Sequence, residues 1–204
     1  MIKKTVLFVV LEQYADWEHA FLSTSLQHGI NGKEPSCEVK VVSPGQGPIH
    51  SNGGFTTIPD YDIDNVPEDY AGLILVGGYS WFSESTGKLT EGAQRIIPLV
   101  EKAFAKGKVI GAICNGTVFL GMAGFLNVRK HTSNGIENLE KLAGSNYAGK
   151  ANYRDAQAVR DGNLITANGT GFLEFSRECM LALDAYSGGD IEANYSFFKN
   201  GLCQ

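Results

Sequence analysis

The sequence predicts an α/β protein whose central sheet is mostly parallel, and three observations lead to this prediction. Apolar runs at residues 5–11, 72–76 and 109–113 are continuous rather than alternating, which is typical of strands buried on both faces of a sheet. Stretches with helical spacing of apolar residues separate these runs, as they do when helices connect parallel strands. The length of 204 residues suits a single domain spanning residues 1–204, and we find neither a linker nor a repeat.

The composition is that of an ordinary globular protein and disfavours several classes of partner. Hydrophobic residues make up 43% of the chain, charged residues 19%, and the net charge is -5. An acidic chain without a basic run argues against nucleic acid or an anionic membrane as the main partner. Four cysteines stand apart without CxxC spacing, so we expect reduced thiols, no metal and no cofactor. They are Cys37, Cys114, Cys179 and Cys203.

The apolar N-terminus imitates a signal peptide but is predicted to be the first strand. Its apolar run ends at Glu12, and Asp16 and Glu18 follow where small residues would mark a cleavage site. The run is also far shorter than the ~20 apolar residues that a membrane-spanning helix needs. We therefore expect a cytoplasmic protein.

In the N-terminal half, apolar strands alternate with helices and one turn-rich region. The predicted elements are strands at 5–11, 37–42 and 72–76 and helices at 16–27 and 90–106. The first helix places four apolar residues on one broad face, namely Trp17, Ala20, Phe21 and Leu26. We expect Gly29 to end that helix, and Pro98 to kink the second helix or begin another. Residues 43–64 are rich in turn signals and favour a hairpin or an irregular excursion.

The C-terminal half continues the alternation and ends in helices. The predicted elements are a strand at 109–113, a helix at 117–122, a short helix with apolar Ile136, Leu139 and Leu142, strands at 158–160 and 163–167, and a helix at 172–186. The pair Asp161-Gly162 is a strong hairpin signal between the last two strands. Residues 143–155 are predicted to be loop, and the tail after Gly189 to add one short helix.

Cys114 is the first candidate for chemistry, because it stands where a buried strand turns into a helix. The strand at 109–113 stops at this cysteine, and Gly116 follows two residues later. A sharp strand-to-helix turn is the geometry of a nucleophile elbow. The helix N-terminus there stabilises a thiolate, so we expect a low pKa for this thiol. The alternative is a buried structural cysteine.

The carboxyl ends of the predicted strands bring further candidates to the same edge of the sheet. These ends are residues 12–18, 77–79, 114–116, 131–134 and 168–171. The backbone N–H groups of Gly77 and Gly78 could serve as an oxyanion hole, or the pair could simply form a tight turn. Either Glu12 or Glu18 could hydrogen-bond Cys114 and stay protonated, and spacing does not choose between them.

A histidine partner for the cysteine is not evident. The four histidines are His19, His28, His50 and His131. Only His131 follows a strand at the right edge of the sheet, which makes it a candidate for catalysis or substrate orientation. No histidine is adjacent to Cys114 in the sequence.

Four segments together resemble the DJ-1/PfpI (ThiJ/PfpI) superfamily. Residues 112–116, AICNG, look like its AICxG nucleophile elbow, and residues 15–18, ADWE, match its acidic turn after the first strand. Residues 70–78, YAGLILVGG, are similar to its YDxxxxPGG segment, with Val76 in place of proline. Residues 161–175, DGNLITANGTGFLEF, resemble its DGxLITxxGxxxxxEF segment.

The resemblance implies a flavodoxin-like three-layer sandwich, related to class I glutamine amidotransferase domains and usually a homodimer. It implies that Glu18 pairs with Cys114 as a protonated acid, and that Gly77 and Gly78 form the oxyanion element. It does not choose among the activities known on this fold.

Departures from the family patterns argue against three activities, namely proteolysis, the glyoxalase reaction of one subgroup, and glutamine amidotransfer. Asn115 stands where family proteases carry histidine, and Asn134 stands where one glyoxalase subgroup carries it. His131 is three residues earlier, in the wrong phase for an extended chain. Residues 168–174 contain no histidine for an amidotransferase.

Two hypotheses of different classes remain. In the first, the protein is a hydrolase or lyase in which Cys114 attacks a small carbonyl-type substrate of unknown identity. Asn115, Asn134, Tyr79 or His131 would orient that substrate. In the second, it is a non-enzymatic redox or stress-response protein that uses oxidation of the same cysteine.

Overall fold

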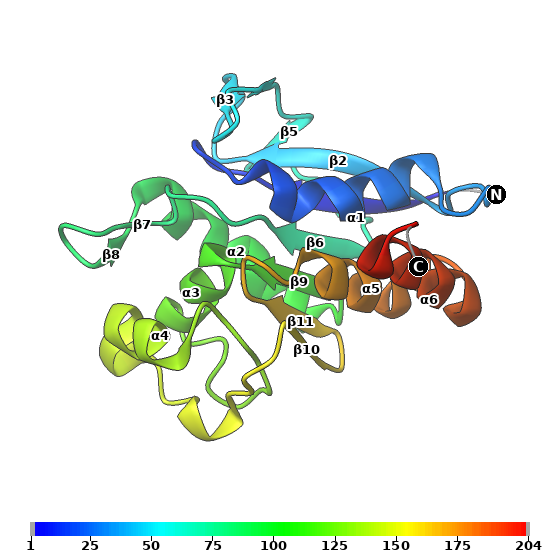
Figure 1. Cartoon of the computed structure of the whole chain (residues 1–204). Coiled ribbons are helices and arrows are strands. Elements are labelled where there is room, and N and C mark those ends of the chain that lie inside the picture. The colour runs from blue at the N-terminus through cyan, green and yellow to red at the C-terminus, as the bar shows by residue number, and fades with distance from the viewer. Residues whose placement is uncertain (1–2, 203–204) are drawn as a thin grey trace.

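The computed structural model describes residues 3–202 and has three layers, a central sheet with helices on both faces (Figure 1). Seven strands form the sheet in the order β10-β11-β9-β6-β1-β2-β5. All neighbouring pairs are parallel except β10 and β11. The strands are β1 (Lys4–Val9), β2 (Cys37–Ser43), β5 (Tyr61–Asp62), β6 (Gly72–Leu75), β9 (Val109–Ile113), β10 (Ala158–Asp161) and β11 (Leu164–Ala167). The predicted fold class, a mostly parallel α/β sandwich, is confirmed.

Two short hairpins lie outside this sheet. One pairs β3 (Ile49–His50) with β4 (Thr56–Thr57), and the other pairs β7 (Phe82–Ser83) with β8 (Lys88–Leu89). The first is the hairpin predicted for residues 43–64, although the same region also supplies β5 to the edge of the main sheet.

Six α-helices are described in residues 3–202. They are α1 (Asp16–His28), α2 (Glu91–Ala105), α3 (Asn115–Met122), α4 (Ile136–Ala143), α5 (Phe172–Ala182) and α6 (Gly188–Asn200). Two 3-10 turns, η1 (Gly144–Asn146) and η2 (Lys150–Asn152), lie in the stretch predicted as loop. No helix in the described part of the chain is long and apolar enough to span a membrane.

Each face of the sheet packs into its own hydrophobic core. Leu7 and Val9 of β1 contribute to the core under α2 and α3, whereas Val6 and Phe8 contribute to the core under α1 and α5. Successive strand residues point to opposite faces, so a strand covered on both faces must be apolar at every position. This is why continuous apolar runs, and not alternating ones, mark the central strands.

Four local expectations are corrected. Helix α2 continues through Pro98, so no second helix begins there, and Pro98 lies on the exposed side, where solvent can bond the carbonyl that loses its partner. Trp17 does not join the buried face of α1 but is 51% exposed. Helix α5 ends at Ala182, before Asp184 adopts a positive φ of 48°. The tail helix α6 is not short, because it runs for 13 residues.

Candidate active site

Cys114 occupies a strained corner between β9 and α3. Its φ of 54° and ψ of -122° lie outside the regions that a side chain favours, at a cost of about 1–3 kcal/mol. The corner is held by the Cys114 N–H donating to the Ala167 carbonyl at 2.9 Å and by the Thr117 hydroxyl donating to the Cys114 carbonyl at 2.6 Å. A Cβ at Gly116 would lie 2.6 Å from the Leu75 carbonyl oxygen, so only glycine lets α3 start this close to β6. These are the features of a nucleophile elbow.

The order of three neighbouring strands brings a carboxyl to the Cys114 thiol. Strands β9, β6 and β1 lie side by side, and Cys114, Gly77 and Glu18 follow their respective carboxyl ends. A Cβ at Gly77 would lie 2.0 Å from Glu18 Oε2 and 2.7 Å from Cys114 Cβ. Glu18 is only 1% exposed, and neither of its oxygens has a well-formed hydrogen bond in residues 3–202. Glu12, by contrast, is exposed and bonds His50.

Asn134 contacts the thiol from the opposite side. Its Nδ2 donates to Cys114 Sγ at 3.1 Å, and its Oδ1 accepts from the Gly169 N–H at 2.9 Å. A Cβ at Gly169 would lie 3.2 Å from both Cys114 Sγ and Glu18 Oε1. The indole of Trp17 in turn donates to the Gly169 carbonyl at 3.1 Å. Sequence reasoning placed residues 168–171 at this edge but did not single out Gly169 or Trp17.

The glycine turn after β6 presents its backbone to the thiol. Gly78 has a φ of 147°, and a Cβ there would lie 2.5 Å from the Gln13 carbonyl oxygen. Asn115 donates from Nδ2 to the Gly78 carbonyl at 2.8 Å, so this asparagine braces the turn. The Gly77 carbonyl accepts from the Ala15 N–H at 3.0 Å. Among the hydrogen bonds of residues 3–202 none uses the Gly78 N–H.

Comparison with known proteins shows the family to which this chain is similar. The model of the DJ-1/PfpI family matches residues 4–182. The chain belongs to the DJ-1/PfpI family. The resemblance drawn from the four sequence segments is therefore confirmed.

Two relatives and two solved structures of other proteins match this DJ-1/PfpI protein over nearly its whole length. It is 34% identical to the uncharacterized protease YdeA of Bacillus subtilis, over 93% of this chain and 88% of the relative. It is 32% identical to the uncharacterized protease YoaZ of the same organism, over 98% and 92%. The structure of a thiJ/pfpI family protein from Bacillus anthracis is 31% identical, with a TM-score of 0.87 over 98% of this chain and 92% of that one. A DJ-1 superfamily protein from Agrobacterium tumefaciens is 29% identical, with a TM-score of 0.82 over 97% and 98%.

Cys114 and Glu18 titrate as a pair in this DJ-1/PfpI site. Burial raises the pKa of Glu18 to about 7, while weak contacts with the Cys114 thiol and the Gly77 N–H act in the opposite direction. Burial, and then the charge of ionised Glu18, raise the pKa of Cys114 to about 12, although the Asn134 amide lowers it. The low thiol pKa expected from the helix N-terminus is therefore wrong, because burial and a neighbouring carboxylate outweigh the helix dipole.

The pKa values of Glu18 and Cys114 define which protonation state of the pair can react. Above about pH 7 the pair has lost one proton and still shares the other. Glu18 is then able to take the thiol proton as the sulfur attacks. The structure thus favours a base-assisted thiol over a permanently ionised one.

His131 does not join the pair and has a structural role instead. It is fully buried, its Nδ1 bonds the Arg129 carbonyl at 2.7 Å, and its Nε2 bonds the Tyr147 hydroxyl at 2.7 Å. Its ring also packs edge-on against Tyr147 and Tyr153. Because both ring nitrogens are occupied, the expectation that His131 orients a substrate is corrected. Of the four residues proposed for that task, Asn134 is the one whose side chain bonds the thiol, whereas Tyr79 is 65% exposed.

Asn134→Asp and Asn134→Ala are expected to separate the two bonds that Asn134 makes. Alanine loses both bonds, whereas aspartate keeps an acceptor for Gly169 but replaces the donor to Sγ with a negative charge. If the Sγ bond matters, both variants slow iodoacetamide alkylation of Cys114 near neutral pH, by about tenfold or less for alanine and by more for aspartate. Asn127→Ala, remote from the thiol, should alkylate at the wild-type rate. If Asn134→Asp instead alkylates at the wild-type rate while Asn134→Ala is slow, the role of Asn134 is only to anchor Gly169.

Proposed function

We propose that this DJ-1/PfpI protein is a cysteine-dependent hydrolase or lyase that acts on a small carbonyl-type compound. The observation that carries the proposal is the buried Glu18 carboxyl placed against the half-buried Cys114 thiol. A carboxyl with a pKa of about 7 exchanges its proton near neutral pH, as a general acid–base group must. A nucleophile with a base placed against it is the minimum that covalent catalysis requires.

The proposed reaction begins with transfer of the Cys114 proton to the Glu18 carboxylate. The sulfur then forms a bond to the carbonyl carbon, and the electron pair of the C=O bond moves to its oxygen. The Gly78 N–H would donate to that oxyanion. Collapse of the intermediate expels a leaving group, which takes the proton back from Glu18. In a hydrolase, water then adds to the acyl carbon as the Glu18 carboxylate takes its proton, and the C–S bond breaks so that the acid product leaves and Cys114 regains its proton from Glu18.

The crowding around the sulfur supports a small substrate. Gly77 and Gly169 approach it so closely that a single methyl group on either would contact the Cys114 side chain. Asn134 covers a further side. The two Bacillus subtilis relatives carry the word protease in their names, but no hydrogen bond in the described chain joins an imidazole to Cys114. A polypeptide substrate or a glutaminase activity is therefore less well supported.

A redox role for Cys114 is the second candidate. Among the described cysteines, Cys37 and Cys179 are fully buried, so Cys114 is the one that an oxidant reaches. An oxidised sulfur would gain oxygens that could accept hydrogen bonds from Asn134 and from protonated Glu18. A partner would then read the changed state. We further propose that the protein is a homodimer in the cytoplasm, which sedimentation and cell fractionation would test.

A screen of aldehydes, amides and thioesters would decide between the two candidates. We expect Cys114→Ser to lose turnover and Cys37→Ser, a substitution at a buried thiol of β2, to keep it. Mass spectrometry after peroxide treatment supplies the second arm. One oxidised Cys114 per chain, without turnover of any compound in the wild type, would favour the redox role instead.

A further inference from the structure

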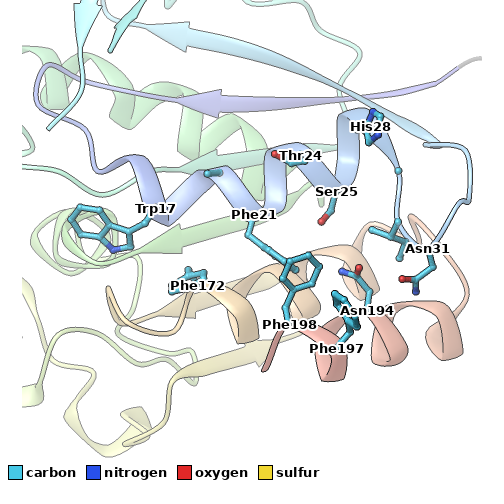
Figure 2. Close-up of a pocket in the computed structure, with 13 residues that line it drawn as sticks. Trp17, Phe21, Thr24, Ser25, His28, Asn31, Phe172, Asn194, Phe197 and Phe198 are labelled. Carbon is cyan, nitrogen blue, oxygen red and sulfur yellow. The ribbon is translucent and has the colours of Figure 1, made fainter. Parts of the chain in front are cut away.

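Helices α1, α5 and α6 enclose an apolar pocket outside the elbow (Figure 2). Its volume is about 640 Å³, within the range of about 300–1,000 Å³ that is usual for small-molecule sites. Aromatic side chains from all three helices dominate its lining, namely Trp17, Phe21, Phe172, Phe197 and Phe198. Phe21 and Phe198 meet edge to face at 4.7 Å, and Phe198 is 53% exposed.

One polar group in this pocket has no partner. Asn194 of α6 is 4% exposed, and its Nδ2 has no hydrogen-bond acceptor in residues 3–202. Figure 2 shows its amide reaching from α6 toward α1, between Phe198 and Asn31. The Ser25 carbonyl, on the α1 side of the pocket, already accepts from the Tyr186 hydroxyl and the Gly29 N–H. A buried donor without an acceptor is costly, and an occupant with an acceptor oxygen would remove that cost.

The pocket wall formed by α6 is fixed in place without an occupant. Glu174 of α5 accepts from the Tyr195 hydroxyl at 2.8 Å and from Lys199 Nζ at 2.7 Å. Asn31 donates to the Asp190 carbonyl at 3.1 Å, which ties the start of α6 to the end of α1. A wall held at both ends gives a pre-formed cavity, which favours binding of a rigid small molecule.

We propose that this pocket binds a small, flat apolar molecule that carries one hydrogen-bond acceptor oxygen, such as an aryl amide. Its apolar body packs against Phe21, Phe172 and Phe198, and its oxygen accepts from Asn194 Nδ2. The site is distinct from the Cys114 thiol and does not depend on the function proposed above.

The two tryptophans of the chain supply a reporter and an internal control. Trp17 lines the pocket, and its indole donates to the Gly169 carbonyl. Trp81 is 1% exposed on the other side of the sheet, and its indole donates to the Val76 carbonyl. Their indole N–H signals in a nitrogen-15 correlation spectrum therefore distinguish occupation of this pocket from a general effect.

Titration with N,N-dimethyl-2-naphthamide tests the proposal. We expect a saturable shift of the Trp17 indole signal and none for Trp81. Asn194→Leu keeps the branched shape of the side chain but removes the donor, and should weaken binding about tenfold, the usual worth of one hydrogen bond. Phe198→Ala should also weaken it, whereas Phe55→Ala, an equally exposed aromatic residue on the hairpin side, should not. Cys114→Ser should bind as the wild type does, even if turnover is lost.

Three results would overturn the proposal. The first is a Trp17 indole signal that does not saturate as the naphthamide is added. The second is naphthamide binding that is as strong in Asn194→Leu and Phe198→Ala as in the wild type. The third is a dimer that Phe198→Asp converts to monomers in sedimentation, because the pocket would then be covered by a second copy of the chain. Phe198 lies on the surface, so its variants stay informative even if Asn194→Leu fails to fold.

Discussion

Glu18→Gln is expected to slow alkylation of Cys114 at least tenfold near pH 8 and, at the same pH, to stabilise the protein. Glutamine cannot accept the thiol proton, so the thiol must ionise alone in a buried site, and the midpoint of alkylation against pH should rise from near 7 to above the ordinary thiol value of about 8.5. The stabilisation follows from the raised pKa of the carboxyl. Burial of an ionised Glu18 opposes folding, and the amide removes that charge.

The pH dependence of this stabilisation has a defined sign. Below pH 4.5 the carboxyl is protonated in the folded and the unfolded chain alike, and Glu18 costs nothing. As the pH rises, the unfolded chain releases the proton first, so folding stability is lost until the folded carboxyl ionises at about 7. A pKa raised from 4.5 to about 7 corresponds to about 3 kcal/mol, which is the upper limit of what the variant regains.

Urea unfolding of both proteins between about pH 4 and 9 measures this difference, because titrating groups that do not interact with Glu18 cancel in the comparison. His19 and His131, whose pKa values burial lowers, are examples of groups that cancel. Glu84, an exposed carboxyl that forms no ion pair within residues 3–202, supplies the matched control, and Glu84→Gln should not produce this stabilisation. Parallel curves for wild type and Glu18→Gln would remove Glu18 from the proton chemistry of the site.

Features that depend on a short stretch of sequence were predictable, and those that depend on tertiary contacts were not. The buried strands are continuous apolar runs, and the elbow needs only a strand, a cysteine and the small Gly116 in succession. Residue spacing left Glu12 and Glu18 equal, and the family pattern favoured Glu18. The structure shows the physical difference, since Glu18 lies on the inward side of the first turn of α1 and Glu12 faces solvent toward His50.

The predictions for His131 and for the thiol pKa of Cys114 were wrong because both depend on tertiary contacts. His131 has the position of a catalytic residue, but its ring is held by Tyr147, a partner in a loop that no periodicity describes. The helix N-terminus at Cys114 is visible in the sequence, whereas the burial that raises the thiol pKa is a property of the packed site. Gly169 escaped notice because its role is an absence of side chain beside the Cys114 sulfur.

Gly77→Ala is expected to abolish the reactivity of Cys114 through a steric effect on the pair. The new methyl group would lie 2.0 Å from Glu18 Oε2 and 2.7 Å from Cys114 Cβ, so at least one of the two side chains must move. We expect alkylation to fall at least tenfold and the free energy of unfolding to fall by about 1–3 kcal/mol, the usual range for overpacking. Gly47→Ala is the control, because open space surrounds that glycine, and neither glycine has a left-handed φ.

A double-mutant cycle shows whether the effect of Gly77→Ala passes through Glu18. In a Glu18→Ala background the nearest clash is gone, so Gly77→Ala should cost less stability than it does in the wild type. Urea unfolding of the four proteins gives the coupling energy directly. Equal costs in the two backgrounds would mean that the methyl group acts on Cys114 alone. A smaller cost in the Glu18→Ala background would show that the glycine turn, the carboxyl and the thiol are packed as one unit. Such packing is what holds the Glu18 carboxyl close enough to the Cys114 thiol to share a proton with it.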